Sequence, residues 1–196
     1  MKIRKATVAD HGAMVSTLVR SFEEDPITNY ILRQDRHRRT AFEKVFEVGV
    51  DIFAKYNELF TTEDLTGVAI WVPPNKWRLS FFQELLLLPR MIRTCSLARL
   101  TRAKAVLGAM KKNHPLKPHM YLYQLGVDPE HRKKGIGSSL LRVMLERCDR
   151  AGLPAYLENT NEANQDLYES QGFEVKGEIQ VSSGAPKFWP MWRKPK

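Results

Sequence analysis

The sequence predicts an α/β domain in which helices pack against one sheet. Three stretches of the chain carry this prediction. Residues 120–152 read as a strand, a glycine-containing loop and an amphipathic helix, and residues 153–173 read as a second strand followed by a short helix. Residues 59–72 contain two strand-forming runs separated by a turn-like segment, which is typical of a hairpin.

Length and composition indicate a single domain. The chain has 196 residues, 43% of them hydrophobic, which is enough to bury one core over residues 1–196. Lys and Arg number 31 against 22 Asp and Glu, and the resulting charge of +9 attracts polyanions such as nucleic acid or anionic lipid. Cys95 and Cys148 suggest neither a disulfide framework nor a metal site.

The apolar runs bear on where the protein resides. The first residues contain no apolar signal region, and the longest apolar runs are too short to span a bilayer. We therefore expect a cytoplasmic protein without a membrane span. The sequence assigns no oligomeric state.

One strand and two helices are expected in the N-terminal third. Residues 2–6 predict an edge strand, and residues 7–10 offer a helix start before an apolar stripe. Asp25 and Pro26 are expected to end this helix. A second helix is expected over about residues 36–56, where large apolar residues recur at helical spacing.

The hairpin strands are expected over residues 59–62 and 67–72. The run over 67–72 is apolar on both faces, as expected for a strand in the middle of a sheet. Pro73 and Pro74 forbid its continuation, because proline cannot donate to a neighbouring strand.

Residues 75–118 predict a helical insertion between the hairpin and the next strand. We expect two helices broken at Pro89, each with an apolar stripe and a basic polar side. The basic residues on these sides are Arg90, Arg93, Arg99, Arg102, Lys104, Lys111 and Lys112. Three interpretations stay open: a solvated face on ordinary packing helices, which is the common case, a lid that shapes a ligand pocket, and a basic surface for membrane or nucleic acid.

The junction after the strand at 119–127 predicts a phosphate-binding loop. Gly135 and Gly137 carry no Cβ, so the backbone there can turn tightly and aim successive N–H groups at an anion. The helix that starts at this point adds the positive end of its dipole. The expected ligand therefore carries phosphate.

This loop departs from two common nucleotide-binding motifs. A Walker A loop places Lys after its glycines, whereas Lys133 and Lys134 precede them here. A dinucleotide-binding loop would need Gly or Ala where the chain has Leu140. The remaining pattern, Arg-x-x-Gly-x-Gly from Arg132 to Gly137, resembles the acetyl-coenzyme A loop of the GNAT N-acetyltransferase superfamily, written there as Gln/Arg-x-x-Gly-x-Gly/Ala.

A second motif follows the next predicted strand. Asn161 can cap a short helix, and Gly172, before Phe173, can take the left-handed conformation that ends it. Asn164 and Tyr168 are spaced i, i+4 and therefore share one helix face. This segment resembles the second GNAT signature, in which an Asn begins a short helix, a Tyr lies two turns on and Gly-Phe closes it.

The resemblance implies a GNAT acyl-CoA N-acyltransferase fold, an α/β fold with a mostly antiparallel mixed sheet, one splayed parallel strand pair and a helical insertion. Residues 119–173 would form the acetyl-CoA-binding core, and coenzyme A is itself a polyanion. Pantetheine would enter the splayed gap and pair with the strand near 125–127, where a backbone N–H would polarise the thioester carbonyl. The implied cofactor-binding residues are Leu125, Gly126, Val127, Arg132, Lys133, Lys134, Gly135, Ile136, Gly137, Ser138 and Asn164.

The C-terminal segment predicts two more strands. Residues 173–181 alternate apolar and polar side chains, residues 182–184 read as a turn, and residues 188–193 can pair back as the last strand. Together with the strand that ends in Trp71-Val-Pro, this end of the chain resembles the puromycin-acetyltransferase-like branch of GNATs, whose acceptors are often small amines.

The resemblance also implies catalytic residues. Tyr168 would lie near the sulfur and donate a proton to the departing thiolate, although its ring could instead pack under the phosphate-binding helix. A base must take the proton of the acceptor, because an alkyl ammonium has a pKa near ~10.4. Glu158 lies nearest the expected gap, with an outward or capping role as the alternative, and Glu63 or His119 could act through water. His131 is expected in the phosphate surroundings or in solvent.

The leading hypothesis is an acetyl-CoA-dependent N-acetyltransferase that acts on a primary amine, which we interpret as that of a small molecule, by direct attack in a ternary complex. The alternative is a basic binding protein for nucleic acid or anionic lipid, with a GNAT-like fold and no transferase activity. Arg132, Gly135, Gly137 and Tyr168 favour the enzyme, since a binding protein has no need of this set. The basic helices lack clustered aromatic residues, which argues against single-strand nucleic-acid binding.

Overall fold

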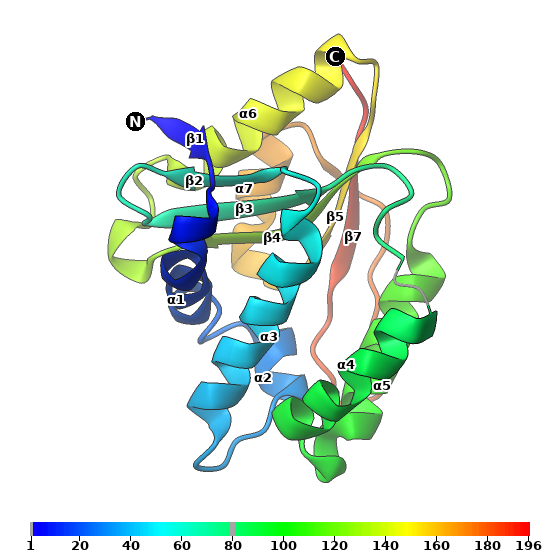
Figure 1. Ribbon diagram of the computed structural model, residues 1–196. Coiled ribbons are helices and arrows are strands. Elements are labelled where there is room, and N and C mark those ends of the chain that lie inside the picture. Colours follow the sequence, from blue (N-terminus) through cyan, green and yellow to red (C-terminus); the bar gives the residue numbers. More distant parts are fainter. Residues whose placement is uncertain (1, 79–80) are drawn as a thin grey trace.

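A seven-stranded mixed sheet forms the centre of the molecule (Figure 1). The computed structural model describes residues 2–78 and 81–196, without the side chains of residues 81–86. The strands are β1 (Ile3–Lys5), β2 (Leu59–Thr62), β3 (Gly67–Val72), β4 (Met120–Val127), β5 (Ala155–Asn159), β6 (Glu174–Val175) and β7 (Trp189–Arg193). They lie in the order β1-β2-β3-β4-β5-β7-β6, with β4 and β5 parallel and the other neighbours antiparallel.

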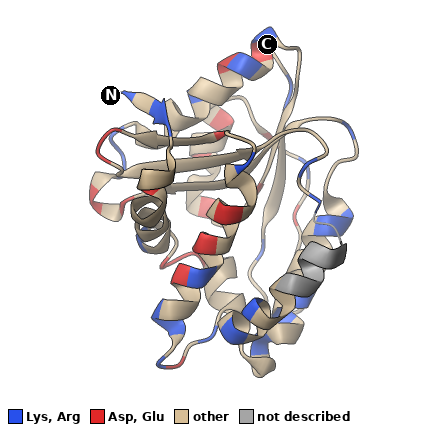
Figure 2. Cartoon of the chain, in the orientation of Figure 1, with Lys and Arg blue, Asp and Glu red and all other residues tan. Residues whose placement is uncertain are grey.

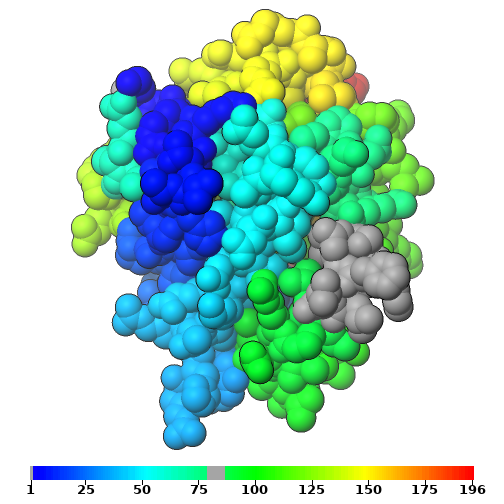
Figure 3. Space-filling view, viewed as in Figure 1, coloured from blue at the N-terminus to red at the C-terminus, as the bar shows by residue number. Residues whose placement is uncertain are grey.

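Helices cover both faces of this sheet. They are α1 (His11–Ser21), α2 (Pro26–Ile31), α3 (Arg38–Ala54), α4 (Phe81–Cys95), α5 (Leu97–Asn113), α6 (Ile136–Arg150) and α7 (Gln165–Ser170). One face carries α6 and α7, and the other carries α1 and α3 (Figure 1). The insertion helices extend this second layer, because α4 packs on α3 and α5 packs on α2, and the space-filling view places them beside α3 (Figure 3). Among the described residues, no helix combines the length and apolar character needed to cross a bilayer.

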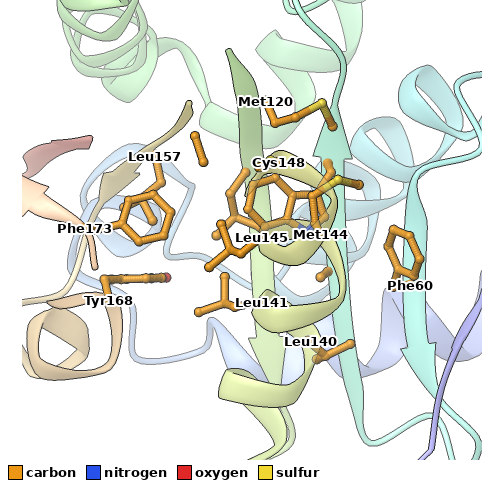
Figure 4. Packing of buried hydrophobic residues seen from close by; sticks show 14 of the residues in the cluster. Phe60, Met120, Leu140, Leu141, Met144, Leu145, Cys148, Leu157, Tyr168 and Phe173 are labelled. Atoms are coloured by element: carbon orange, nitrogen blue, oxygen red, sulfur yellow. The ribbon is translucent and has the colours of Figure 1, made fainter. Parts of the chain in front are cut away.

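The apolar stripe of α6 forms the core on its side of the sheet. Leu140, Leu141, Met144 and Leu145 pack there, and Cys148 extends the same stripe as the sequence predicts (Figure 4). Burying each large apolar side chain contributes about 1.5–3 kcal/mol. This packing fixes the start of α6, and therefore the loop before it, against the sheet.

Strand β4 carries one extra residue opposite β3. Ile70 pairs with Gln124, whereas the next residue, Trp71, pairs with Leu122, so Tyr123 is left over as a β-bulge. A bulge bends its strand and redirects the side chains that follow it. The second half of β4 therefore points differently from the first.

Just before this bulge, β4 parts from β5. The parallel register contains Met120 with Ala155 and Tyr121 with Tyr156, and the described residues show no further pair. On its other side β4 stays paired with β3 as far as its last residue. The splayed parallel pair that the resemblance implies is confirmed, and it opens towards the loop that precedes α6.

The N-terminal helices differ from the prediction at one junction. Helix α1 already ends at Ser21, and Asp25 with Pro26 begins α2 rather than ending α1. Asp25 Oδ1 accepts a hydrogen bond from Thr28 N at 2.7 Å, and Pro26 occupies the first helical position, where its missing N–H costs nothing. The Asp-Pro pair therefore begins a helix, and the expectation that it ends one is wrong.

The insertion and the C-terminal segment also differ from the prediction. Helix α4 continues through Pro89, and the break falls at Ser96, whose φ of 61° is left-handed. An internal proline costs about 3 kcal/mol, and the packing of α4 on α3 and α5 offsets that cost. The strand expected over 173–181 shortens to β6, because only Ile179 pairs again beyond it, with Phe188.

Candidate functional site

Around the point where they part, β4 and β5 carry buried polar atoms that lack hydrogen-bond partners. Within the described part of the chain, four side chains here have an atom without a hydrogen bond: Gln124 Oε1, Tyr156 OH, Glu158 Oε1 and Asn159 Nδ2. Leaving a buried polar group unsatisfied costs about 1–3 kcal/mol. Such a cluster is typical of a place where a ligand or a mobile proton completes the bonding.

The loop at the open end of this gap is shaped as an anion seat. Lys133 and Gly135 take φ values of 60° and 79°, so the chain turns sharply into α6. The N–H groups of Ile136, Gly137 and Ser138 lie in the first turn and have no carbonyl acceptor within the helix. These groups and the positive end of the helix dipole favour a phosphate.

The three basic side chains of the loop differ in their contacts. Arg132 Nη2 donates to the carbonyl oxygen of Ser21 at 2.7 Å, which holds the loop against the end of α1. Lys134 Nζ donates to the carbonyl oxygen of Glu130 at 3.1 Å. Lys133 is exposed beside the first turn. In this structure Arg132 therefore ties the loop to α1, whereas the side chain of Lys133 stays exposed to solvent.

The second motif forms as the sequence predicts. Asn161 Oδ1 accepts from Ala163 N at 3.1 Å and caps the turn before α7, and Gly172 has a φ of 89° where the helix ends. Asn164 begins α7 and is exposed, whereas Tyr168, one turn later, is buried. The shared helix face thus runs from solvent into the core.

Helix α7 lies beside the start of α6. A Cβ added to Gly137 would lie 3.2 Å from Leu167 Cδ2 and 3.9 Å from Val127 Cγ2. The end of β4, the first turn of α6 and α7 therefore meet at one point. The predicted residues Leu125, Gly126 and Val127 lie on the part of β4 that leads there.

Tyr168 occupies the α6 side of the sheet. Its side chain is buried beside Leu157 and Phe173, with the ring of Phe173 edge-on at 6.1 Å (Figure 4). Burial raises the pKa of Tyr168, and the charge of Asp25 adds to the rise. Tyr168 is therefore a neutral hydroxyl near pH 7, and Glu158, which follows Leu157 on β5, points to the opposite face.

Glu158 lies in a buried aromatic cluster on that opposite face. Its side chain is 3% exposed, and its Oε1 atom lies 3.4 Å from His114 Nδ1. Burial raises the pKa of Tyr121 and of Tyr156, and the negative charge of Glu158 raises both further. The two phenols therefore keep their protons beside this carboxyl group. The outward or capping role considered for Glu158 is excluded by its burial.

Two histidines from the end of the insertion complete the cluster. His114 stacks on Trp77 with ring centroids 3.7 Å apart, and His119 Nε2 lies 3.0 Å from His114 Nε2. His119 was expected near the gap, but His114 was not. A histidine at the end of a helix and before a proline belongs to no recognisable motif. The contact between His114 and Glu158 therefore becomes visible only in the tertiary structure.

The remaining candidates lie elsewhere. Glu63 forms an exposed ion pair with Lys2 at 2.6 Å, which removes it from consideration as a base. His131 belongs to the short turn before the loop, and its Nδ1 atom is buried without a partner among the described residues. Its expected place in the phosphate surroundings stays a prediction.

Part of the basic surface of the insertion is structural. Figure 2 shows Lys and Arg gathered on α4 and α5. Arg99 donates to the carbonyl oxygens of Asn29, Tyr30 and Leu32 at 2.7–3.2 Å, and the guanidinium of Arg102 lies over the Tyr30 ring. These two arginines fasten α5 to α2, as expected for charged backs on packing helices.

Comparison with known proteins gives a family match. The model of the Acetyltransferase (GNAT) family matches residues 57–173, which is more than half of the chain and includes β2 to β5, the phosphate loop, α6 and α7. An uncharacterized N-acetyltransferase of Schizosaccharomyces pombe is 23% identical over 207 residues, covering 93% of this chain and 78% of the relative.

Solved structures share the fold. A histone acetyltransferase HPA2 and related acetyltransferase from Corynebacterium glutamicum matches with a TM-score of 0.73 at 24% identity, covering 100% of this chain and 96% of the other. Arylalkylamine N-acetyltransferase 2 from Aedes aegypti matches with a TM-score of 0.65 at 16% identity, covering 100% and 99%. At these identities the likeness concerns the arrangement of helices and strands.

Proposed function

This chain belongs to the GNAT family and is an N-acetyltransferase, and we propose that it transfers the acetyl group of acetyl-CoA to a primary amine of a small molecule while both substrates are bound. The observation that carries this proposal is Glu158, a carboxyl group that is 3% exposed at the point where β4 and β5 part. A buried carboxyl group among aromatic rings suits an ammonium ion, which is attracted to both.

The residues of the gap and loop fit acetyl-CoA. The first-turn N–H groups of α6 and exposed Lys133 would take the pyrophosphate, and Gly137 lets this turn pack closely against Leu167 of α7. The unpaired edge of β4 over residues 125–127 would hold the pantetheine amides. The thioester supplies an already activated acetyl group, so the protein has to orient the amine and to manage protons.

Glu158 and Tyr168 carry out the two proton transfers of the reaction on opposite faces of the sheet. Glu158 takes a proton from the ammonium nitrogen, which makes the amine nucleophilic, because free alkyl ammonium groups titrate near ~10.4. Tyr168, neutral because burial raises its pKa, gives a proton to the thiolate that leaves. Glu158 projects from β5 and Tyr168 from α7, on opposite faces of the sheet, so amine and thiol meet from opposite sides.

The proposal is tested by following thiol release from acetyl-CoA with a panel of small primary amines. We expect turnover with at least one amine, and Glu158→Gln should lower kcat/KM on the order of a hundredfold. Its affinity for acetyl-CoA, measured by calorimetry, should stay unchanged. Glu63→Gln is the matched control, since Glu63 forms only an exposed ion pair. Absence of both acetyl-CoA binding and turnover would favour the basic binding protein instead.

A further inference from the structure

A chain of buried groups runs from Glu158 towards the protein surface. His114 Nδ1 lies 3.4 Å from Glu158 Oε1, and His114 Nε2 lies 3.0 Å from His119 Nε2. His119 Nδ1 in turn lies 2.6 Å from the carbonyl oxygen of Lys117. Glu158, His114 and His119 are all buried, whereas Lys117 is exposed.

The contacts fix where the protons of the two histidines lie. A carbonyl oxygen only accepts hydrogen bonds, so His119 Nδ1 carries a proton and donates it to Lys117 O. Burial lowers the pKa of His119, which leaves the ring neutral near pH 7 and its Nε2 atom without a proton. The proton between the two rings therefore belongs to His114 Nε2.

This assignment leaves a conflict at Glu158. A neutral His114 with its proton on Nε2 presents a lone pair at Nδ1, and an ionised Glu158 presents a lone pair at Oε1. Two acceptors would then face each other in a buried place, and Oε1 has no hydrogen-bond partner among the described residues, although the phenols of Tyr121 and Tyr156 lie beside the carboxyl group. One more proton between these atoms removes the conflict.

We propose that Glu158 and His114 share one proton in the resting protein, and that Glu158, His114 and His119 form the route by which the proton of the acceptor ammonium leaves the site. This inference rests on the proposed N-acetyltransferase function. It makes His114 and His119 positioning and relay residues that act through Glu158, which alone faces the amine.

The transfer balances along the chain. A proton leaves the ammonium nitrogen for the carboxylate of Glu158, and the shared proton settles on His114 Nδ1. The proton of His114 Nε2 then moves to His119 Nε2. The positive charge of the ammonium ion thus ends on the imidazolium of His119, while Glu158 holds the proton taken from the amine and His114 is a neutral ring with its proton on Nδ1.

The last group of the proton route, His119, is buried behind a hollow in the protein surface. A hollow of about 270 Å³ is lined by Pro115, Lys117, Tyr156 and Trp192. The ring of His119 packs edge-on against Tyr156 and Trp192, with centroids 5.4 and 5.5 Å away. His119 therefore stands directly behind the wall of this hollow, where a proton can pass to solvent.

The surroundings of the chain are mostly uncharged. The groups that face it are Tyr121 and Tyr123 of β4, Tyr156 of β5, Trp192 of β7, and Trp77, over whose ring the Arg78 guanidinium lies at 5.0 Å. Burial raises the pKa of all three tyrosines, so they stay protonated. The proton of the proposed route is therefore carried by Glu158 and the two histidines, and not by the phenols.

The shared proton is tested without any substrate. Nitrogen-15 NMR of the histidine rings should give a neutral His119 with its proton on Nδ1. At pH 7 either His114 should carry protons on both ring nitrogens or carbon-13 NMR should find the Glu158 carboxyl protonated. In Glu158→Gln, His114 should become a neutral ring with its proton on Nε2. A neutral His114 beside an ionised Glu158 in the wild-type protein would overturn the proposal.

The route is tested by kinetics with two substitutions at one position. His119→Asn keeps a donor for Lys117 O, and His119→Gln keeps an acceptor for His114, but neither side chain can relay a proton. Both should lower kcat on the order of tenfold or more and shift the acidic limb of its pH profile, with unchanged acetyl-CoA affinity. Because the NMR test needs no turnover, it decides on the shared proton even if no amine is acetylated.

The control for these substitutions is His11→Gln. His11 is distant in sequence from His114 and His119, and its Nε2 atom lies 2.8 Å from Asp51 Oδ1, between α1 and α3. Its pH profile should match that of the wild-type protein. A wild-type pH profile in folded His119→Asn and His119→Gln would remove the histidines from the route, while activity itself would still support the proposed function.

Discussion

Thr160 Oγ1 donates a hydrogen bond to Asp25 Oδ2 at 2.5 Å and so ties the start of α2 to the end of β5. Asp25 also accepts from Thr28 N at 2.7 Å as the N-cap of α2. Burial raises the pKa of Asp25 more than these hydrogen bonds lower it. The contact places a titratable group at the edge of the gap, close enough to Tyr168 for its charge to raise the pKa of that phenol.

The raised pKa of Asp25 predicts how stability depends on pH. The folded protein holds the Asp25 proton more tightly than the unfolded chain does. The contribution of this proton to the free energy of unfolding is therefore fully present below the unfolded pKa of about 3.9. It is lost as pH rises through the higher folded value. Asp25→Asn keeps a capping acceptor without the charge. Its unfolding free energy should therefore increase relative to that of the wild type as pH rises. Urea unfolding over a pH series measures the difference.

Asp35→Asn provides a control with the opposite sign. Arg33 donates to both carboxylate oxygens of Asp35, and this contact lowers the pKa of Asp35 to about 2. The stabilisation is present above the unfolded pKa and is lost as pH falls. The unfolding free energy of Asp35→Asn should therefore be lower than that of the wild type at neutral pH, and the difference should shrink as pH falls. If both variants followed the same trend, the assignment for Asp25 would be wrong.

The ion pair between Arg193 and Asp149 predicts a second pH effect. Two guanidinium nitrogens of Arg193 donate to the two carboxylate oxygens of Asp149 at 2.7 and 2.8 Å, and the Arg193 side chain is 4% exposed. Asp149→Asn leaves this buried cation without its partner and should cost on the order of 3 kcal/mol at pH 7. Arg193 lowers the pKa of Asp149 to about 2, so the difference should shrink as pH falls towards that value.

Thermal and urea unfolding of Asp149→Asn can be compared with Glu174→Gln. Glu174 forms an exposed ion pair with Lys176 at the sheet edge, and such pairs contribute at most about 1 kcal/mol. A cost for Asp149→Asn as small as that for Glu174→Gln would show that Arg193 finds other acceptors.

Local signals account for most of what the sequence predicted correctly. The hairpin, the strand–loop–helix junction and the turn capped by Asn161 each depend on residues that lie close together in the chain. Glycines such as Gly135 and Gly172 mark backbone conformations that other residues resist, so their positions could be read directly. The GNAT family and its fold follow from these motifs and are confirmed.

Tertiary packing decided what the sequence could not predict. The bulge at Tyr123 appears only when β4 is aligned with β3, and the path of α4 through Pro89 depends on its contacts with α3 and α5. The meeting of His114 with Glu158 joins residues 44 positions apart that belong to no shared motif. The single domain over 1–196, the puromycin-acetyltransferase-like branch and the role of the insertion stay predictions.

Gly137→Val tests the phosphate seat. The Cβ of the new side chain would start 3.2 Å from Leu167 Cδ2 and 3.9 Å from Val127 Cγ2, so the valine would crowd α7 and the end of β4 and displace the first turn of α6. We expect acetyl-CoA affinity to fall on the order of a hundredfold or more in calorimetry, because the pyrophosphate could no longer reach the N–H groups. Gly12→Val, in the first turn of α1 with no atom within 4 Å of its Cβ, is the control for helix propensity. Retained affinity in folded Gly137→Val would refute the loop assignment.

Tyr168→Phe separates the chemical role of the hydroxyl from the packing of the ring. The ring contacts with Leu157 and Phe173 stay, so the variant should fold and bind acetyl-CoA as the wild type does. Turnover should fall by about tenfold to a hundredfold, because the thiolate would leave without a proton donor. The expected loss lies in kcat, and it should diminish with acetyl donors whose thiols are more acidic, since such thiolates need less help to leave. Tyr56→Phe, at a half-buried position in the turn after α3, controls for loss of a phenol on another element. A rate for Tyr168→Phe that equals that of the wild type with every donor would leave Tyr168 with a packing role alone.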